Sequence, residues 1–230
     1  MHTVEDLTKN FGKPADDTEN TFTARMLLML ESTPILGETA YGHAVDRVID
    51  IYWRNYRGHE TDYLPIILLN DIVRYWRIVL LNYEAKNFAD VGAAGDPDRR
   101  LRSYKLRFSR CMTCFSAVAY LLAATTLADG NVSRESVVRM VRTRPLDRMV
   151  LIARWLKRRP LVGQRIDELL ELYSAFLQET NASEDELLRR FGRLAHRRAR
   201  SREGARFGQK MFELVEELGR DNPLYRYVVV

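Results

Sequence analysis

The sequence contains few residues that interrupt helices. It has 12 glycines and 7 prolines among 230 residues, while apolar residues make up 46% of the chain. Leu, Ala, Arg and Glu are plentiful, and these residues favour helix over sheet. The apolar fraction is ordinary for a globular protein and large enough to form a buried core. The composition therefore argues against a sheet-rich fold and predicts an all-α protein.

Cysteine is also scarce. Cys111 and Cys114 form the only CxxC pattern, with no second pair and no nearby histidine to complete a zinc site. The pair lies within an apolar helical pattern, and no βαβ pattern surrounds it. We therefore expect two small core residues rather than a redox pair, and we assign no metal ligand in this sequence.

Long hydrophobic runs are missing as well. No run approaches the roughly 20 apolar residues needed to cross a bilayer. The longest, residues 111–128, is interrupted by Ser116, Tyr120, Thr125 and Thr126. The opening residues MHTVEDLTKN are polar and acidic and resemble no secretory signal. We therefore expect a cytoplasmic protein with no membrane partner.

The net charge of +5 is unevenly distributed. Residues 1–63 carry eleven acids and six bases, a net charge of −5. Residues 134–165 carry ten bases and two acids, and residues 189–206 carry eight arginines and one glutamate. The second half of the chain is thus a candidate surface for a polyanion or an acidic partner.

The first twenty residues show no apolar period. They contain Gly12, Pro14 and a polar run, so we predict that residues 1–20 form a flexible arm or linker. Helical periodicity begins after them. We expect residues 21–130 to form a helical bundle and residues 131–230 to form a basic helical extension.

Two long helices are predicted at the centre of the bundle, over residues 65–86 and 101–127. The loop chemistry of residues 90–99 joins them, so they should pack antiparallel. In the extension, Ser183 and Glu186 have the spacing of a capping box, and the tail over 224–230 has strand-like composition. The helices expected there span residues 133–143, 146–158, 162–180, 184–200 and 203–218.

The segment LLNDIVRYWR, residues 68–77, places polar groups within an apolar helix. Its apolar stripe includes Leu69 and Trp76, and the polar groups share a neighbouring face at helical spacing. The grouped polar side chains must find partners or face a cavity. They are Asn70, Asp71, Arg74 and Arg77.

The next long helix carries a second basic set, at Lys105, Arg107 and Arg110. Antiparallel packing would bring it near the first set. Two interpretations stay open. Either the cations pair with internal acids such as Asp71, Glu84 and Glu31, or they face an anion-binding cleft.

Together, LLNDIVRYWR, the later KLRFSR and the upstream ARMLLMLES resemble the helical domain that follows the catalytic domain in predicted bacterial nucleotidyltransferases of the DNA polymerase β superfamily. The resemblance covers about residues 20–127. In that family the helical domain forms one wall of the nucleotide cleft. The resemblance implies that Asn70 and Asp71 orient the cations, and that the triphosphate would contact Arg74, Arg77, Lys105, Arg107 and Arg110.

The chain departs from this family in its catalytic part. The family's catalytic domain carries a Gly-Ser motif and paired metal-binding carboxylates on strands, whereas this sequence has no Gly-Ser dipeptide. We therefore assign no catalytic residue and expect no cofactor bound by this chain alone. The resemblance implies that Mg²⁺ and a nucleoside triphosphate would bind together with a partner catalytic domain or chain. Toxin–antitoxin and antiphage systems are associated with this family.

Two other classes of function stay open. A helical ribonuclease of the HEPN type uses an Arg and a His four to six residues apart on one helix, and Arg190 and His196 meet that spacing loosely. Alternatively, the chain is an adaptor that binds RNA or DNA through phosphate contacts. The candidate patches are Lys157, Arg158 and Arg159, and Arg197, Arg198 and Arg200. A second copy of the chain is also open as a partner.

Overall fold

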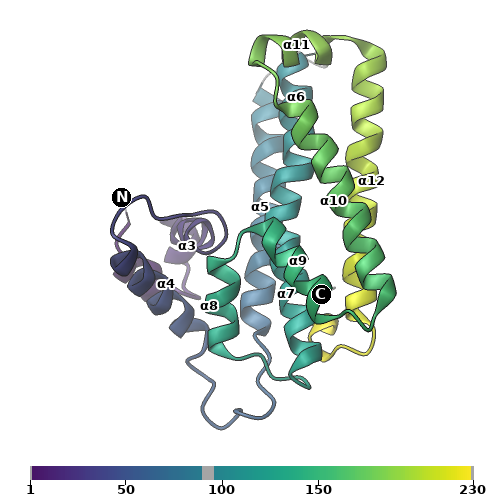
Figure 1. Cartoon of the computed structure of the whole chain (residues 1–230). Helices are drawn as coiled ribbons and strands as arrows, with labels where there is room; N and C mark the ends of the chain where they lie inside the picture. The colour runs from purple at the N-terminus through teal and green to yellow at the C-terminus, as the bar shows by residue number, and fades with distance from the viewer. Residues whose placement is uncertain (1, 90–95, 229–230) are drawn as a thin grey trace.

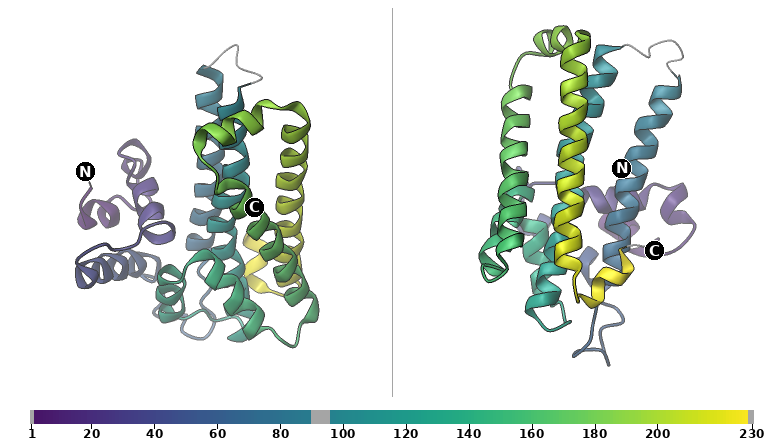
Figure 2. Two further views of the ribbon diagram at one scale, coloured as in Figure 1. Left: turned by 45° about the horizontal axis from the view of Figure 1, so that its top comes forward. Right: turned by 90° about the vertical axis from the view of Figure 1, so that its right-hand side faces the viewer.

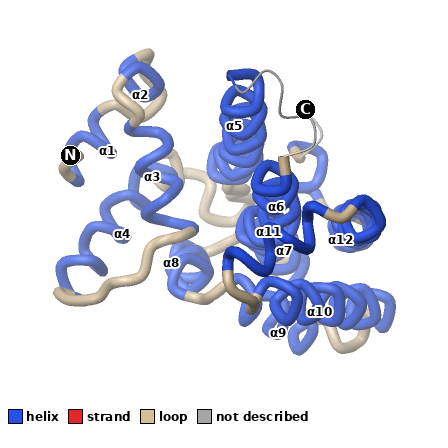
Figure 3. The backbone as a smooth tube through the Cα atoms, turned by 90° about the horizontal axis from the view of Figure 1, so that it is seen from above, coloured by secondary structure: helices blue, strands red, loops and turns tan. Residues whose placement is uncertain are grey.

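The computed structural model describes residues 2–89 and 96–228, without the side chains of residues 86–89. Its described residues are helical, with no strand among them, which confirms the predicted all-α class (Figure 1). A small group of N-terminal helices lies beside the bundle formed by the later helices (Figure 3), and the bundle is the taller of the two (Figure 1).

The N-terminal group contains four helices, α1 (Val4–Lys9), α2 (Ala15–Thr18), α3 (Thr21–Leu30) and α4 (Glu38–Tyr52). The bundle begins with α5 (Ile66–Ala89), α6 (Pro97–Lys105), the π-helical turn η1 (Leu106–Arg110) and α7 (Cys111–Leu127). It continues with α8 (Arg134–Arg142), α9 (Pro145–Trp155), α10 (Pro160–Thr180), α11 (Glu184–Gly192), α12 (Leu194–Gly219) and the 3₁₀ turn η2 (Pro223–Tyr227). Helix α12 packs between α7 and α10, and α11 lies across one end of the bundle (Figures 1 and 2).

Helix α7 is the buried centre of the bundle. Helices α5, α9 and α12 pack around it, so its sequence has no polar face. The continuous helix Pro97–Leu127 is long and apolar enough to cross a membrane, and 72% of its most apolar window is buried inside the protein. Cys111 and Cys114 are buried free thiols in α7, and burial raises the pKa of each to about 12. The prediction of two small core residues is confirmed.

The structure corrects the prediction of a flexible arm over residues 1–20. Residues 4–9 and 15–18 are helical, and Leu7 and Phe11 are buried in the core. Thr3 and Asp6 form a capping box at the start of α1. Helices of four to six residues are too short to show an apolar period, so the sequence pattern missed them.

The buried guanidinium of Arg25 holds this N-terminal segment in place. Arg25 is 0% exposed and makes a bidentate contact with the Asp16 carboxylate at 2.9 and 2.7 Å. It also donates to the Leu7 carbonyl at 3.1 Å and to the Tyr52 hydroxyl at 3.1 Å. Burial alone would raise the pKa of Asp16, but hydrogen bonds from Arg25 and Thr21 outweigh it and lower that pKa.

The same network accounts for the carboxylate in LLNDIVRYWR. Asp71 accepts a hydrogen bond from the Tyr52 hydroxyl at 2.7 Å, and its carboxylate lies 3.7 Å from the Arg25 guanidinium. Burial raises the pKa of Asp71. Arg74 pairs with Asp17 of the N-terminal segment rather than with Asp71. Both side chains therefore bind partners from helices that precede α5: Arg74 binds Asp17, and Asp71 binds Tyr52 and Arg25.

Two other local predictions are wrong, and one lies partly outside the described residues. The helix expected over 184–200 is broken, because Arg193 is extended (φ −83°, ψ 126°) between α11 and α12. The strand-like tail instead begins with the 3₁₀ turn η2, whose Tyr225 ring packs against Gly219. Residues 90–95 of the predicted loop lie outside the described range, and Pro97 already begins α6.

Neighbouring aspartates allow a test of the Arg25 network. Asp16→Asn removes the negative charge that Arg25 contacts at 2.7 Å, and breaking a buried pair costs about 3–5 kcal/mol of unfolding free energy. Asp17→Asn makes the same chemical change in an exposed pair, where the cost is about 1 kcal/mol or less. Urea unfolding of the two variants measures both values. Equal losses would show that the Arg25 network does not hold the N-terminal segment.

Candidate cationic phosphate site

The predicted nucleotide-binding residues do not form a single site. Arg74 contacts Asp17, and Arg110 contacts Glu31, which also accepts a hydrogen bond from the Tyr75 hydroxyl at 2.8 Å. Together with Asp71, these side chains therefore take part in internal pairs. This arrangement matches the ion-pair interpretation for three of the predicted residues.

The other predicted residues on these helices point outwards. Asn70 is exposed and donates to the Ile66 carbonyl of its own helix at 3.1 Å. Arg77 and Lys105 are exposed, and no ion pair joins either of them to another described residue. Only Arg107 enters a pocket with other cations.

Arg107 lies in the π-helical turn η1, which interrupts the helix between α6 and α7. Its side chain crosses α12 at Gly204, where a Cβ atom would lie 3.0 Å from the Arg107 Cδ. The absence of a side chain at Gly204 thus gives the arginine its path across the neighbouring helix. Helical π turns recur at functional sites, and here the turn directs a cation toward α12.

A pocket of about 430 Å³ opens where α6 and η1 meet α11 and α12. It brings together residues about a hundred positions apart in the chain. Five of its lining side chains are arginines, and no carboxylate is among the described lining residues. The lining consists of Arg100, Ser103, Tyr104, Arg107, Phe191, Leu194, Arg197, Arg198, Arg200 and Ser201. We call this pocket the cationic pocket.

Aromatic packing beneath the pocket holds its walls together. The Phe108 ring stacks on Phe176 of α10 at 4.7 Å and on Phe207 of α12 at 4.5 Å. Tyr104 packs against Phe176 and Phe191 at 5.4 and 5.6 Å. These rings bury large apolar areas, so the spacing between α6 and α12 is set by the core and not by the arginines.

Among the described residues, acids pair with Arg200 of the pocket but not with Arg107 or Arg198. Arg200 pairs with Glu203 at 2.8 Å and with Glu179 at 3.6 Å. The Tyr104 hydroxyl donates to Glu203 at 3.2 Å, and burial together with the Glu203 charge raises the pKa of Tyr104. Arg107 and Arg198 are exposed, and no ion pair holds either of them within the described part of the chain.

The two predicted nucleic-acid patches lie at opposite ends of α12. Arg197, Arg198 and Arg200 line the cationic pocket near its start. Near its end, Arg159 donates to the Glu217 carbonyl at 2.6 Å, with Lys157 and Arg158 exposed beside it. Nineteen residues of helix separate positions 198 and 217, which is about 28 Å. The patches therefore do not form one continuous surface.

The arrangement of Arg190 and His196 differs from the expected ribonuclease pattern. Arg190 belongs to α11 and His196 to α12, so they do not share a helix. Both contact Glu179 of α10, at 3.3 and 3.4 Å. Their side chains thus converge on an internal carboxylate. The ribonuclease activity itself stays a prediction.

Sequence reasoning missed Arg100, Ser103 and Ser201 as members of one pocket. Each helix carried a signal in its spacing. Arg100, Ser103 and Arg107, at i, i+3 and i+7, share one helix face, and Arg197 and Ser201, at i and i+4, share another. The meeting of the two faces could not be derived from either helix alone. Within the described residues, no group of three or more His, Cys, Asp or Glu side chains could hold a metal ion.

Comparison with known proteins found no matching family model, no matching curated protein and no matching solved structure. The resemblance to nucleotidyltransferase helical domains therefore stays a prediction.

His196 gives a prediction for the pH dependence of stability. Burial lowers the pKa of His196 below its usual 6.5, so the unfolded chain takes up a proton at higher pH than the folded one does. This contribution to stability is complete above pH 6.5 and is lost as the pH falls toward the folded pKa. Unfolding free energies at pH 7.5 and 5.5 should thus differ less in His196→Gln than in the wild type. The matched control, His59→Gln at an exposed site, should keep the wild-type difference.

Proposed function

We propose that this chain binds the phosphate backbone of RNA or DNA through the cationic pocket. The observation that carries the proposal is the convergence of five arginines, from two distant segments, on one pocket without a lining carboxylate. The guanidinium group presents several donors in a plane and matches phosphate oxygens with two parallel hydrogen bonds. Ser103 and Ser201 add hydroxyl donors to the same lining.

The surrounding helices extend this positive surface. The continuous α6–η1 segment, residues 97–110, carries six bases and one acid, and residues 189–206 carry eight arginines and one glutamate. Contacts between α6 and both α11 and α12 place these segments on one end of the bundle (Figure 2). A chain of phosphates crossing this end would meet cations from both.

The type of contact indicates binding without sequence preference. Tyr104 and Phe191 are 4% and 1% exposed, so their rings are not available for base stacking of the kind that single-strand binders use. Phosphate contacts alone give affinity that depends on salt and not on base sequence.

A nucleoside triphosphate is the competing ligand. The volume of the pocket, about 430 Å³, falls in the range of small-molecule sites, and triphosphate oxygens would find the same guanidinium groups. The resemblance adds the further proposal that the chain acts beside a separate nucleotidyltransferase catalytic chain, without catalysis of its own.

Substitution in the pocket tests the proposal. Fluorescence anisotropy with a labelled mixed-sequence 20-nucleotide strand should show an affinity that falls steeply with salt. Each phosphate contact contributes about 0.7 to the slope of log K against log [salt] for a single strand. Arg107→Gln with Arg198→Gln should weaken binding and reduce that slope by about 1.4. A flat salt response would contradict the proposal.

The other end of α12 provides the matched control. Lys157→Gln with Arg158→Gln removes two exposed cations outside the pocket and should leave the slope unchanged. If this pair lowers the affinity as much as the pocket pair does, the binding is diffuse and the pocket is not the site. Displacement of the strand by micromolar ATP with Mg²⁺, abolished in the pocket variant, would favour the nucleotide as ligand.

A further inference from the structure

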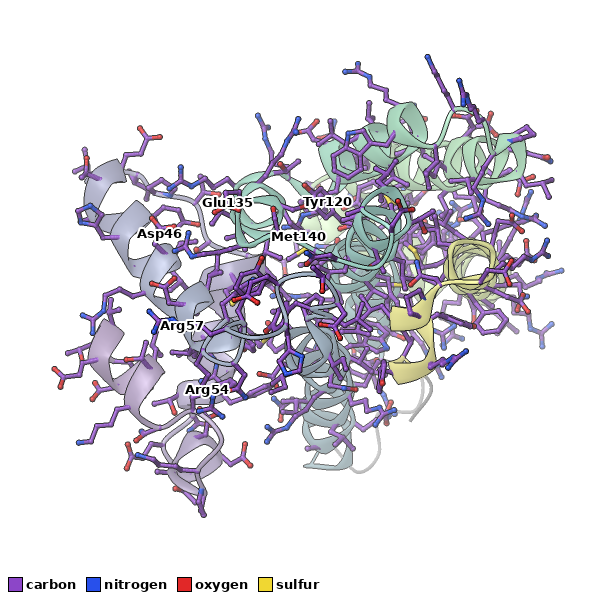
Figure 4. All side chains as sticks on the ribbon, turned by 90° about the horizontal axis from the view of Figure 1, so that it is seen from below. Asp46, Arg54, Arg57, Tyr120, Glu135 and Met140 are labelled. Atoms are coloured by element: carbon purple, nitrogen blue, oxygen red, sulfur yellow. The ribbon has the colours of Figure 1, made fainter. Side chains whose placement is uncertain are left out.

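A second and larger cleft lies between the N-terminal group and the bundle. It has a volume of about 850 Å³ and is walled by α3 and α4 on one side and by α8 and the start of α9 on the other. Figure 4 shows Asp46 of this first wall beside the helix that carries Glu135 and Met140. The cleft shares no lining residue with the cationic pocket.

A buried cation, Arg148 of α9, lines this cleft. Its side chain is 1% exposed. Nε donates to the Met140 carbonyl at 2.9 Å, and Nη1 lies 3.3 Å from both the Thr113 carbonyl and the Ser116 hydroxyl. These acceptors are all neutral, and no acceptor for Nη2 is present among the described residues.

The two arginines that are fully buried in the described part of the chain therefore differ in their charged partners. Arg25 has the Asp16 and Asp71 carboxylates within 4 Å, whereas no described carboxylate pairs with Arg148. Burial without a counter-charge lowers the pKa of Arg148 to about 10. A buried charge without a partner costs several kcal/mol, so an anion in the adjoining cleft would bind where the protein lacks one.

Two further features strengthen the positive wall. Arg142 reaches across from α8, and its Nη2 lies 3.0 Å from the position of a Cβ atom on Gly42 of α4. Helix α9 begins within the lining at Pro145, and its N-cap residue Arg144 makes no side-chain cap hydrogen bond. The positive end of the helix dipole therefore lies at the same wall.

The opposite wall has the complementary chemistry. Glu38, His43 and Asp46 line it together with the hydroxyls of Ser32, Thr33 and Thr39. Glu31 of this wall is already paired with Arg110, and Asp46 lies 3.4 Å from Arg134. The wall thus offers hydrogen-bond acceptors to the hydroxyl or amino groups of a ligand whose anionic end faces Arg148.

We infer that this cleft binds a small phosphorylated metabolite, with its phosphate at Arg142, Arg148 and the start of α9 and its hydroxyl groups toward the α3–α4 wall. Two full positive charges and a helix N-terminus match a phosphate monoester dianion better than a single carboxylate. The inference is independent of nucleic-acid binding, because the two sites use different arginines.

Variants must separate binding from folding. Arg148 also holds the C-terminal carbonyl of α8, so its loss is expected to destabilise the protein. Arg142 is exposed and has no ion pair among the described residues, which makes Arg142→Gln the informative change. Arg154→Gln, at an exposed position of α9 outside the cleft lining, is its matched control.

The experiment is isothermal titration of the full chain with ribose 5-phosphate, inorganic phosphate and acetate at constant ionic strength. Ribose 5-phosphate should bind saturably with one site in the wild type and in Arg154→Gln, and at least tenfold more weakly in Arg142→Gln. The variant carrying Arg107→Gln and Arg198→Gln should bind it like the wild type. Bound ligand should also raise the melting temperature.

Several results would overturn the inference. These are the absence of saturable ribose 5-phosphate binding at millimolar concentration, equal binding by Arg142→Gln, or loss of binding only in the Arg107 and Arg198 variant. Binding of inorganic phosphate alone would reject a metabolite and leave a site for the free ion. Equal binding of acetate would reject the preference for phosphate.

Discussion

The guanidinium of Arg25 is the interaction on which the placement of the N-terminal helices depends. It joins the Leu7 carbonyl, the Asp16 carboxylate and the Tyr52 hydroxyl, and the Tyr52 hydroxyl in turn donates to Asp71 of α5. A buried charge must have such partners, so α1, α2, α4 and α5 can pack only in the arrangement that supplies them. Because α4 forms one wall of the large cleft, the shape of that cleft follows from the same constraint.

Arginines in this protein occupy three electrostatic environments. Arg25 is buried with carboxylates, Arg148 is buried with neutral acceptors, and Arg107 and Arg198 of the cationic pocket are exposed without an ion pair among the described residues. The pairing of Arg25 is explained by the fold alone. Arg148 and these two arginines of the cationic pocket leave positive charge that an anionic ligand would neutralise. This difference in pairing separates candidate binding cations from structural ones.

Local patterns predicted much of the fold. The helices expected over 133–143 and 162–180 are observed as Arg134–Arg142 and Pro160–Thr180, and Ser183 accepts a hydrogen bond from the Glu186 amide as a cap should. The apolar period and the capping residues lie within each segment, so neighbouring residues suffice to indicate them. The prediction of a flexible arm over residues 1–20 was wrong because α1 and α2 are stabilised by contacts with Arg25 and not by their own periodicity.

The candidate site also combines features that local sequence indicates with features that depend on tertiary contacts. The sequence by itself determined an all-helical chain, polar faces on two long helices and a basic second half, because composition and helical spacing are local properties. Only the tertiary structure decided which cations meet. It paired Arg74 and Arg110 with acids, placed Arg107 beside Arg197 and Arg198, and left Arg148 without a carboxylate. The pairing of charges depends on distances between segments far apart in the chain, and the packing of the helices sets those distances.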